Sequence, residues 1–155
     1  MSVELGDTLP DVALTRPDGT KIDLRASIGT PLVLYFYPKD DTTGCTREAQ
    51  DFGALYPDFQ AIGVEVLGVS KDTPAKHAKF ITKYDLKVPL ASDEDGSVTE
   101  AFGVWIEKQL YGKTYMGIDR STWLFDAAGT LQKVWRKVKV PGHAAAVMEA
   151  AKALG

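Results

Sequence analysis

A run of six apolar residues, Leu32 to Tyr37, constrains the fold of this chain more than any other feature. The run is continuous, rich in aromatic side chains and bounded by prolines, which is typical of a strand buried on both faces of a sheet. Such a strand needs other structure packed over both faces, because it has no polar face to present to water. The run therefore predicts a central strand of an α/β protein.

Strands and helices are expected to alternate along the rest of the chain. Four apolar residues recur at spacings of three and four and predict a helix that begins near Cys45; they are Ala49, Phe52, Tyr56 and Phe59. Thr73 is a suitable N-cap and Pro74 a suitable first residue for a second helix, which should end near Tyr84. The other expected elements are strands at 62–69, 88–91, 121–125 and 131–138, a short helix around 98–102 and a closing helix at 144–154.

The opening of the chain predicts a β-hairpin. Apolar segments at 12–14 and 21–24 flank Pro17-Asp18-Gly19, whose proline presets one backbone angle and whose glycine accepts a positive φ. No repeat, low-complexity tract or linker divides the chain, and its 155 residues lie near the commonest domain length. We therefore expect one domain over residues 1–155, with a mixed central sheet flanked by helices and an N-terminal hairpin.

Charge and hydropathy argue against several classes of function. Lysine and arginine number 18 against 21 acidic residues, so a net charge of −3 gives no basic surface for nucleic acid or an anionic membrane. The basic segment 135–139 is expected to alternate between the faces of an edge strand. No apolar stretch approaches the roughly 20 residues that span a bilayer, and the N-terminus does not resemble a secretion signal. We expect a cytoplasmic protein that binds neither nucleic acid nor membrane.

Cys45 is the only cysteine of the chain. A single cysteine is usually a small buried hydrophobe, so its surroundings decide whether it reacts. Here it follows Thr42-Thr43-Gly44 and opens the amphipathic helix at the end of the buried strand, where free backbone N–H groups and the helix dipole favour an anion. This position favours a thiolate.

The segment from Pro38 to Cys45, PKDDTTGC, resembles the active-site motif of the peroxiredoxins, in particular of the branch called bacterioferritin comigratory protein. The proline, threonine and cysteine stand at that family's spacing, after the expected apolar strand. The similarity continues through Asp93-Glu94-Asp95-Gly96, Phe102-Gly103-Val104-Trp105, Lys113-Thr114-Tyr115 and Gly117-Ile118-Asp119-Arg120, so it covers essentially the whole chain. The resemblance implies a thioredoxin-like α/β fold and a peroxidase, and we expect neither a cofactor nor a bound metal.

The resemblance also implies roles for four residues. Cys45 is similar to the peroxidatic cysteine, whose thiolate attacks the terminal oxygen of a hydroperoxide and becomes a sulfenic acid. Thr42 resembles the hydroxyl that hydrogen-bonds the thiolate and the incoming peroxide. Pro38 resembles the ring that shields the thiolate from water, and Arg120 the guanidinium that stabilises the charges. Considered singly, each residue has a structural explanation that serves as well: Thr42 as an N-cap, Pro38 as a strand terminator and Arg120 as part of a surface ion pair.

Ionisation of a thiol does not by itself explain fast catalysis. Lowering a thiol pKa from about 8.5 to about 6 raises the thiolate fraction at neutral pH about thirtyfold. The accompanying loss of nucleophilicity removes roughly tenfold of that gain. Alignment of the O–O bond and stabilisation of the leaving oxygen must supply the remaining acceleration. Arg120 and Thr42 are therefore expected to be the critical partners of Cys45.

Many members of this branch carry a second cysteine five positions after the first, but this chain has Gln50 there. No intrachain disulfide can form, so the sulfenic acid must react with an external thiol or with another copy of Cys45. We expect a one-cysteine cycle that reduces hydrogen peroxide and organic hydroperoxides. The expected reductant is thioredoxin, glutaredoxin or glutathione, and the expected assembly is a monomer or weak dimer.

Other sites fit the sequence less well. His77 and His143 lie on separate expected elements and lack partners at metal-ligand spacing. The acidic run at 93–95 lacks the later ligands of a calcium loop. Asp40 and Asp41 are expected to point outward, since a negative charge beside the sulfur would disfavour a thiolate.

Two alternative functions are also open. A thiol–disulfide oxidoreductase on the same scaffold would need a C-x-x-C pair, which the sequence does not contain. A redox sensor or relay, in which oxidised Cys45 passes a disulfide to a partner, needs only one cysteine. Steady turnover of peroxide with an added thiol would separate catalysis from a single stoichiometric oxidation.

Overall fold

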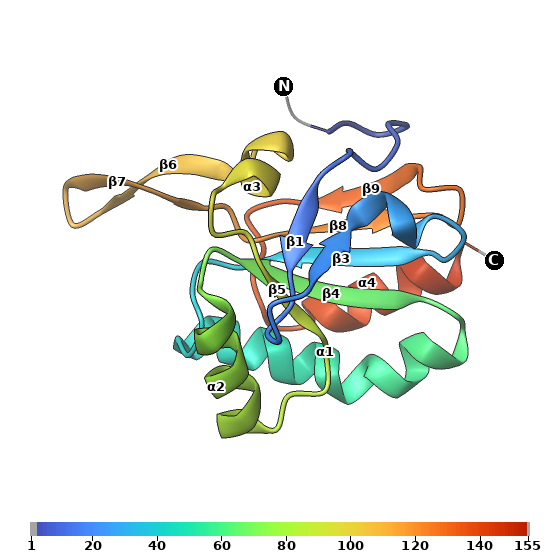
Figure 1. The fold of residues 1–155 in the computed structure, drawn as a ribbon, viewed down its shortest axis with the longest axis horizontal. Coiled ribbons are helices and arrows are strands. Elements are labelled where there is room, and N and C mark those ends of the chain that lie inside the picture. The colour runs from blue at the N-terminus through green and yellow to red at the C-terminus, as the bar shows by residue number, and fades with distance from the viewer. Residues whose placement is uncertain (1–2, 155) are drawn as a thin grey trace.

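The structure is a computed structural model that describes residues 3–154. Figure 1 shows a twisted layer of strands with helices packed against it and one hairpin that extends away from the body. In chain order the elements are β1 (Ala13–Thr15), β2 (Lys21–Asp23), the 3-10 helix η1 (Leu24–Ser27), β3 (Leu32–Phe36), α1 (Thr43–Ala61), β4 (Glu65–Ser70), α2 (Pro74–Tyr84), β5 (Leu90–Ser92), α3 (Ser97–Ala101), β6 (Trp105–Leu110), β7 (Lys113–Ile118), β8 (Ser121–Phe125), β9 (Leu131–Trp135) and α4 (His143–Lys152).

Seven strands form one mixed sheet in the order β2-β1-β5-β4-β3-β8-β9. β3 lies between a parallel neighbour, β4, and an antiparallel neighbour, β8. All five residues of β3 are buried, as the continuous apolar run predicts. β1 and β2 form the expected N-terminal hairpin, and β1 extends the sheet by pairing Thr15 with Ser92 of β5. The prediction of a mixed α/β sheet with an N-terminal hairpin is confirmed.

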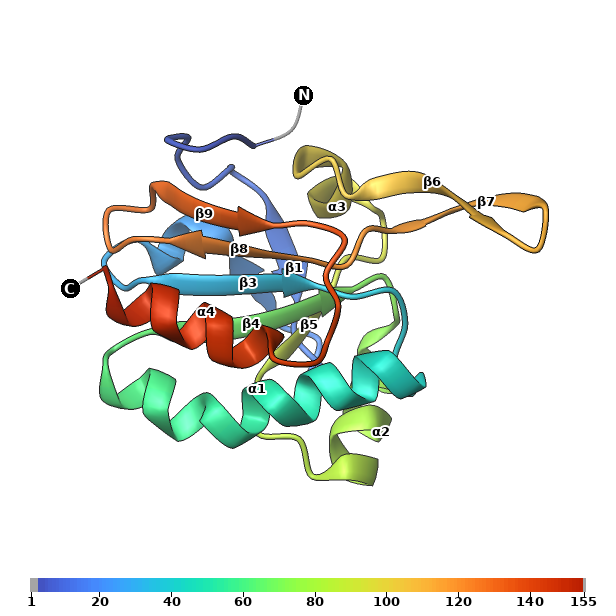
Figure 2. The same ribbon diagram turned by 180° about the vertical axis from the view of Figure 1, so that it is seen from behind.

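The side chains of β3 contribute to two cores on opposite faces of the sheet, because successive residues of a strand point in opposite directions. Tyr35 belongs to a cluster with residues of α1, α2 and α4. Leu34 and Phe36 belong to a second cluster that includes residues of the N-terminal hairpin and α3. Figure 2 shows α1 and α4 side by side on one face of the sheet. The end of β3 therefore leads straight from the centre of the molecule into the loop before α1.

The helix after β3 carries the predicted apolar stripe and begins near Cys45, as predicted. Three residues of the stripe are almost fully buried and Tyr56 is half-buried. α1 begins at Thr43, two residues before Cys45, and continues to Ala61. Because Ile62 serves as its C-cap, β4 begins at Glu65 and not at residue 62.

The start of α2 agrees with the sequence prediction, whereas the end of β9 differs from it. The hydroxyl of Thr73 accepts a hydrogen bond from the amide of Lys76, so Thr73 is the N-cap of α2 as predicted. β9 ends at Trp135, three residues before the predicted end. Lys137 adopts a positive φ of 48°, which extended backbone cannot accommodate.

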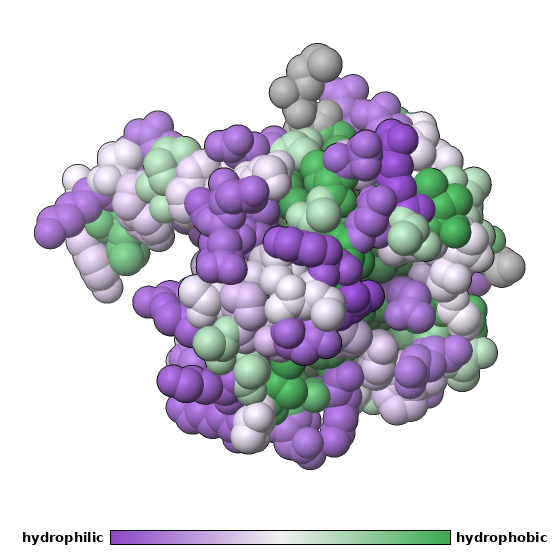
Figure 3. Space-filling view, viewed as in Figure 1, coloured by the Kyte–Doolittle hydropathy of each residue, from purple (hydrophilic) through white to green (hydrophobic). Residues whose placement is uncertain are grey.

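The hairpin of β6 and β7 was not expected from the sequence. It pairs Trp105 with Ile118 at its base and Leu110 with Lys113 near its tip. Most of its side chains are exposed on both faces, and Tyr111 at the turn is 95% exposed. The segment therefore lacks the alternation of a half-buried strand. Figure 3 shows this arm standing clear of the body.

Within residues 3–154, none of the helices is long and apolar enough to cross a membrane.

Candidate active site

Cys45 lies in the first turn of α1, directly after the loop that leaves β3. Its helix begins at Thr43, and the N-cap Thr42 has extended backbone angles of φ −95° and ψ 156°. The first amides of a helix have no carbonyl partner within it, and the positive end of the helix dipole lies there. Cys45 itself is only 1% exposed. The fold thus holds the thiol where an anion is favoured and covers it from solvent.

Arg120 reaches the sulfur from the turn between β7 and β8. Its Nη2 donates to Cys45 Sγ at 3.2 Å, although the two residues are 75 positions apart in the chain. Its Nη1 donates to Glu48 Oε1 at 2.7 Å, and the arginine side chain is 17% exposed. The planar guanidinium thus bridges the thiol and a carboxylate with two of its donors. A positive donor at this distance stabilises negative charge on sulfur.

Glu48 is a member of the site that sequence reasoning missed. It lies three residues after Cys45 on the same buried face of α1, and its side chain is 1% exposed. Burial raises the pKa of this carboxyl from 4.5 to about 7, and Arg120 opposes part of that rise. Its signal in the sequence was a charged residue on an apolar helix face. Glutamate is almost never fully buried unless it is paired, so a glutamate at such a position indicates a buried partner.

The shifted pKa of Glu48 predicts that stability depends on pH. The unfolded chain releases the Glu48 proton near pH 4.5, whereas the folded chain retains it to about pH 7. The contribution of this group to the free energy of unfolding is therefore complete below pH 4.5 and is lost as the pH rises through about 7. In urea titrations, wild type should lose more stability than Glu48→Gln between about pH 5 and about pH 8. An equal loss in both proteins would contradict this assignment.

Gly44 leaves space for the guanidinium. A Cβ at this position would lie 3.2 Å from Arg120 Nη2, the same nitrogen that contacts Cys45 Sγ. Alanine would therefore displace the guanidinium by a few tenths of an ångström while favouring the helix. We predict that Gly44→Ala lowers the peroxidase rate about tenfold and leaves the thermal midpoint unchanged or higher. Stopped-flow rates and thermal unfolding of the same preparation check this, and a wild-type rate would contradict it.

Pro38 and Arg120 line the same hollow at the surface, which has a volume of about 500 Å³. Pro38 is half-buried and lies two residues after the end of β3. The β6–β7 arm forms one wall through residues that include Ile106 and Tyr115, and the segment after β9 forms another through Val138. The hollow is the route by which a small molecule could approach the guanidinium.

Thr42 has a different contact from the one its resemblance implied. Its hydroxyl donates to the carbonyl oxygen of Lys39 at 2.9 Å, and the residue is exposed. It lines a separate hollow on the outer side of α1, together with residues such as Gln50. In this conformation the hydroxyl of Thr42 therefore stabilises the loop.

In the part of the chain that the structure describes, residues 3–154, no group of three or more His, Cys, Asp or Glu side chains is placed to hold a metal ion.

Comparison with known proteins is decisive for the family. The AhpC/TSA family model matches residues 5–134. The chain is 48% identical over 151 residues to peroxiredoxin Bcp of Xanthomonas campestris, covering 97% of this chain and 94% of that protein. It is 44% identical over 152 residues to peroxiredoxin Bcp of Bacillus subtilis, covering 98% and 97%. The chain belongs to the AhpC/TSA family.

A solved structure supports the same assignment for this peroxiredoxin. The bacterioferritin comigratory protein of X. campestris, studied for alkyl peroxide reduction in trapped intermediate and ligand complexes, superposes with a TM-score of 0.88. It is 47% identical, and the match covers 95% of this chain and 98% of that one. The chain therefore has the thioredoxin-like fold and is a thiol-dependent peroxidase. Both the resemblance and the function that it implied are confirmed.

One prediction about this peroxiredoxin's loop is wrong. Asp40 was expected to point outward, but it is 8% exposed, and its carboxylate accepts a hydrogen bond from Tyr37 and contacts His77. Asp41 is exposed as expected, although it bonds to Lys83. The error arose because the partner that draws Asp40 inward is 37 residues away in the sequence.

Proposed function

We propose that the Cys45 thiolate attacks the terminal oxygen of a hydroperoxide. The new S–O bond forms as the O–O bond breaks, which gives a sulfenic acid and a hydroxide or alkoxide that takes up a proton. The observation that supports this assignment most strongly is the 3.2 Å contact between Arg120 Nη2 and Cys45 Sγ. The contact places a permanent positive charge and several N–H donors beside the reacting atom.

Arg120 and Pro38 are assigned complementary roles. The guanidinium places a positive charge beside the sulfur and has donors that can follow negative charge as it moves to the leaving oxygen. Glu48 fixes its orientation through the bond to Nη1. The ring of Pro38 lines the approach and limits access of water to the sulfur. Thr42 is assigned as a donor to the bound peroxide after its hydroxyl turns from the carbonyl of Lys39.

The hollow above Arg120 suits peroxides of more than one size. Its volume of about 500 Å³ easily admits hydrogen peroxide. Apolar side chains such as Ile106 and Val138 can contact the alkyl group of an organic hydroperoxide. We therefore assign both classes as substrates, consistent with the alkyl peroxide reduction studied for the X. campestris relative.

Reduction of the sulfenic acid is assigned to an external thiol. Cys45 is the only cysteine of the chain, so an intrachain disulfide is impossible. The first external thiol forms a mixed disulfide with Cys45 and releases water, and a second thiol exchanges with it to regenerate the Cys45 thiolate. The reductant is thioredoxin, glutaredoxin or glutathione.

The test of this proposal is steady-state turnover in three arms. Peroxide consumption is followed with thioredoxin and its reductase, with glutaredoxin plus glutathione, and with glutathione alone. Many turnovers per protein in at least one arm are expected. A single equivalent of peroxide consumed in every arm would instead favour the sensor or relay that passes oxidation to a partner.

A one-cysteine cycle also predicts overoxidation. Without a resolving cysteine in the chain, the sulfenic acid persists until an external thiol arrives, and peroxide can oxidise it further. With excess peroxide and no thiol, the intact mass should rise by two oxygen atoms, at Cys45, to the sulfinic acid. Adding the thiol before the peroxide is the control that should suppress this product. An unchanged mass after peroxide would contradict the prediction.

We further assign this peroxidase to the cytoplasm, as a monomer or weak dimer. Three apolar residues, Phe102, Val104 and Trp105, are candidates either for internal packing or for a dimer surface. Phe102 and Val104 are fully buried within the chain, whereas Trp105 is half-buried. Sedimentation at several concentrations tests the assembly state, and a tight dimer would contradict it.

A further inference from the structure

One cation in the hollow above Arg120 has no part in the proposed attack on a peroxide. Lys108 of β6 lines this hollow together with Arg120, and its side chain belongs to the wall that the β6–β7 arm forms. Hydrogen peroxide is uncharged and needs only the donors beside the sulfur of Cys45. A second positive side chain in the same hollow can instead bind a negative group on a larger substrate.

The hairpin directs Lys108 towards Arg120 and away from the tip of the arm. Lys108 pairs with Tyr115 across the two strands, and Gly117 lies two residues nearer the base. A Cβ on Gly117 would be 3.2 Å from Lys108 Cδ and 3.5 Å from Lys108 Cε. The lysine stem therefore lies across the bare backbone of Gly117. Because β7 ends at Ile118, just before Arg120, the ammonium is carried to the end of the arm that holds the guanidinium.

The ammonium of Lys108 is available to an anion. Within residues 3–154 it forms no ion pair. Asp119 also lines the hollow, but its carboxylate already accepts hydrogen bonds from Arg136 Nε at 2.8 Å and from the amide of Lys137 at 3.1 Å. Glu107 is exposed on the opposite face of β6, since successive residues of a strand alternate. The described part of the chain thus supplies Lys108 with no acidic partner.

The surroundings of Lys108 disfavour its charge in the free protein. Burial lowers the pKa of the ammonium from 10.5, and the guanidinium of Arg120 lowers it further, while Asp119 and Cys45 act in the opposite direction. A bound carboxylate would offset both unfavourable effects, because it supplies an opposite charge inside a half-buried hollow. The attraction is also stronger there than at a fully exposed lysine, where water screens it.

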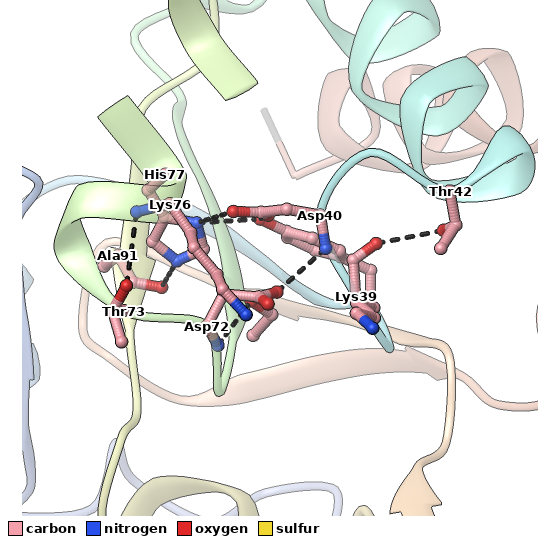
Figure 4. A network of polar contacts seen from close by, with 10 residues as sticks. Lys39, Asp40, Thr42, Asp72, Thr73, Lys76, His77 and Ala91 are labelled. Atoms are coloured by element: carbon pink, nitrogen blue, oxygen red, sulfur yellow. Dashed lines mark hydrogen bonds and ion pairs between the residues drawn. The ribbon is translucent and has the colours of Figure 1, made fainter. Parts of the chain in front are cut away.

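A second group of lysines, beside α2, is a poorer site for an anion. Four lysines and three aspartates line that hollow: Lys39, Lys76, Lys79, Lys83, Asp40, Asp41 and Asp72. Figure 4 shows Lys39 and Lys76 grouped with Asp40 and Asp72. Lys83 is already paired with Asp41. Carboxylates thus offset most of the positive charge in that hollow, which makes its lysines suitable controls.

We propose that Lys108 binds the carboxylate of an acidic organic hydroperoxide while the peroxide group lies beside Arg120 and Cys45. This inference rests on the proposed function, because it assigns a substrate class to the same site. The sulfur forms a bond to the terminal peroxide oxygen as the O–O bond breaks. The leaving alkoxide takes up a proton, and the product is a hydroxy acid. Lys108 selects among substrates and takes no part in cleavage of the O–O bond.

A matched pair of substrates tests the proposal. γ-Hydroperoxy-γ-methylvalerate carries a carboxylate, and its methyl ester has the same tertiary hydroperoxide without the charge. In single-turnover stopped flow, wild type should be oxidised about three- to tenfold faster by the acid than by the ester, between the effects of an exposed ion pair and of a buried charged hydrogen bond. Added salt should lower this acid-to-ester ratio and leave the rate with the ester unchanged.

Three variants show whether the ratio depends on Lys108. Lys108→Met removes the charge but keeps an unbranched stem over Gly117, so the ratio should fall to about one while the rates with ester and hydrogen peroxide stay within about twofold of wild type. Lys108→Arg restores a positive charge and should retain most of the ratio. Lys76→Met removes the same charge from the hollow beside α2 and should keep the wild-type ratio.

Several outcomes would overturn the proposal. One is a wild-type ratio near unity, and another is a ratio that persists in Lys108→Met. Equal losses with acid, ester and hydrogen peroxide in Lys108→Met would mean that Lys108 supports the sulfur and not a carboxylate. Loss of the ratio in Lys76→Met would assign the effect to net charge. Failure of the proposed function would show differently, as no oxidation of Cys45 in wild type by any of the three peroxides.

Discussion

Cys45→Ser should lower the rate of peroxide consumption to the uncatalysed background, a loss of at least about 10⁴-fold. Serine has nearly the size of cysteine, so the buried site next to Arg120 should keep its shape. Its hydroxyl does not ionise near neutral pH and is a far weaker nucleophile towards a peroxide oxygen. Turnover of hydrogen peroxide with an external thiol, measured on wild type and variant at equal concentration, checks this.

Circular dichroism and thermal unfolding of Cys45→Ser provide the control. The free energy of unfolding should change little, because the replacement fills the same space. A variant that folds normally and still consumes peroxide with a thiol at the wild-type rate would exclude Cys45 as the nucleophile.

Arg120→Ala has the second-largest expected effect, a fall of about 10²- to 10³-fold in the second-order rate with peroxide. The variant loses the positive donor 3.2 Å from the sulfur and leaves Glu48 without its ion-pair partner. Thiolate ionisation alone is a small net contribution, because the gain in thiolate is largely offset by lower nucleophilicity. The loss should therefore exceed the change in the thiolate fraction of Cys45, measured by its ultraviolet absorbance against pH.

Arg120→Lys is the matched variant for this prediction. An ammonium retains the charge but cannot bond the sulfur and Glu48 with a fixed fork of donors. We expect it to recover ionisation of the thiol but only a small part of the rate. If the rates of both variants follow their thiolate fractions, stabilisation of the leaving oxygen by Arg120 is contradicted.

The parts of the fold that could be predicted are those in which one segment contains its own signal. β3 is a continuous apolar run, and Thr73 with Pro74 marks the start of α2 within two residues. The β6–β7 arm has no such signal, because its side chains are exposed on both faces and its pairing is stabilised by contacts within the hairpin. Segments that bury little apolar area give a weak pattern in the sequence.

The candidate site was likewise predictable only where one segment, or the resemblance, contained the signal. Cys45 was identified from its position after the buried strand, and Arg120 entered through a resemblance that spans most of the chain. The contact of Arg120 with Glu48 and the inward turn of Asp40 depend on partners 72 and 37 residues away. Such contacts depend on the packing of α1, α2 and the β7–β8 turn, which periodicity in one segment does not encode.

The most direct test of the central claim is to trap the product of the first oxidation. The protein is treated with one equivalent of hydrogen peroxide in the presence of a sulfenic-acid reagent, and its peptides are analysed by mass spectrometry. We predict one adduct, on the peptide that carries Cys45, formed as fast as the peroxide is consumed. Rapid consumption of peroxide with no adduct at Cys45 and no higher oxidation of its sulfur would contradict the account.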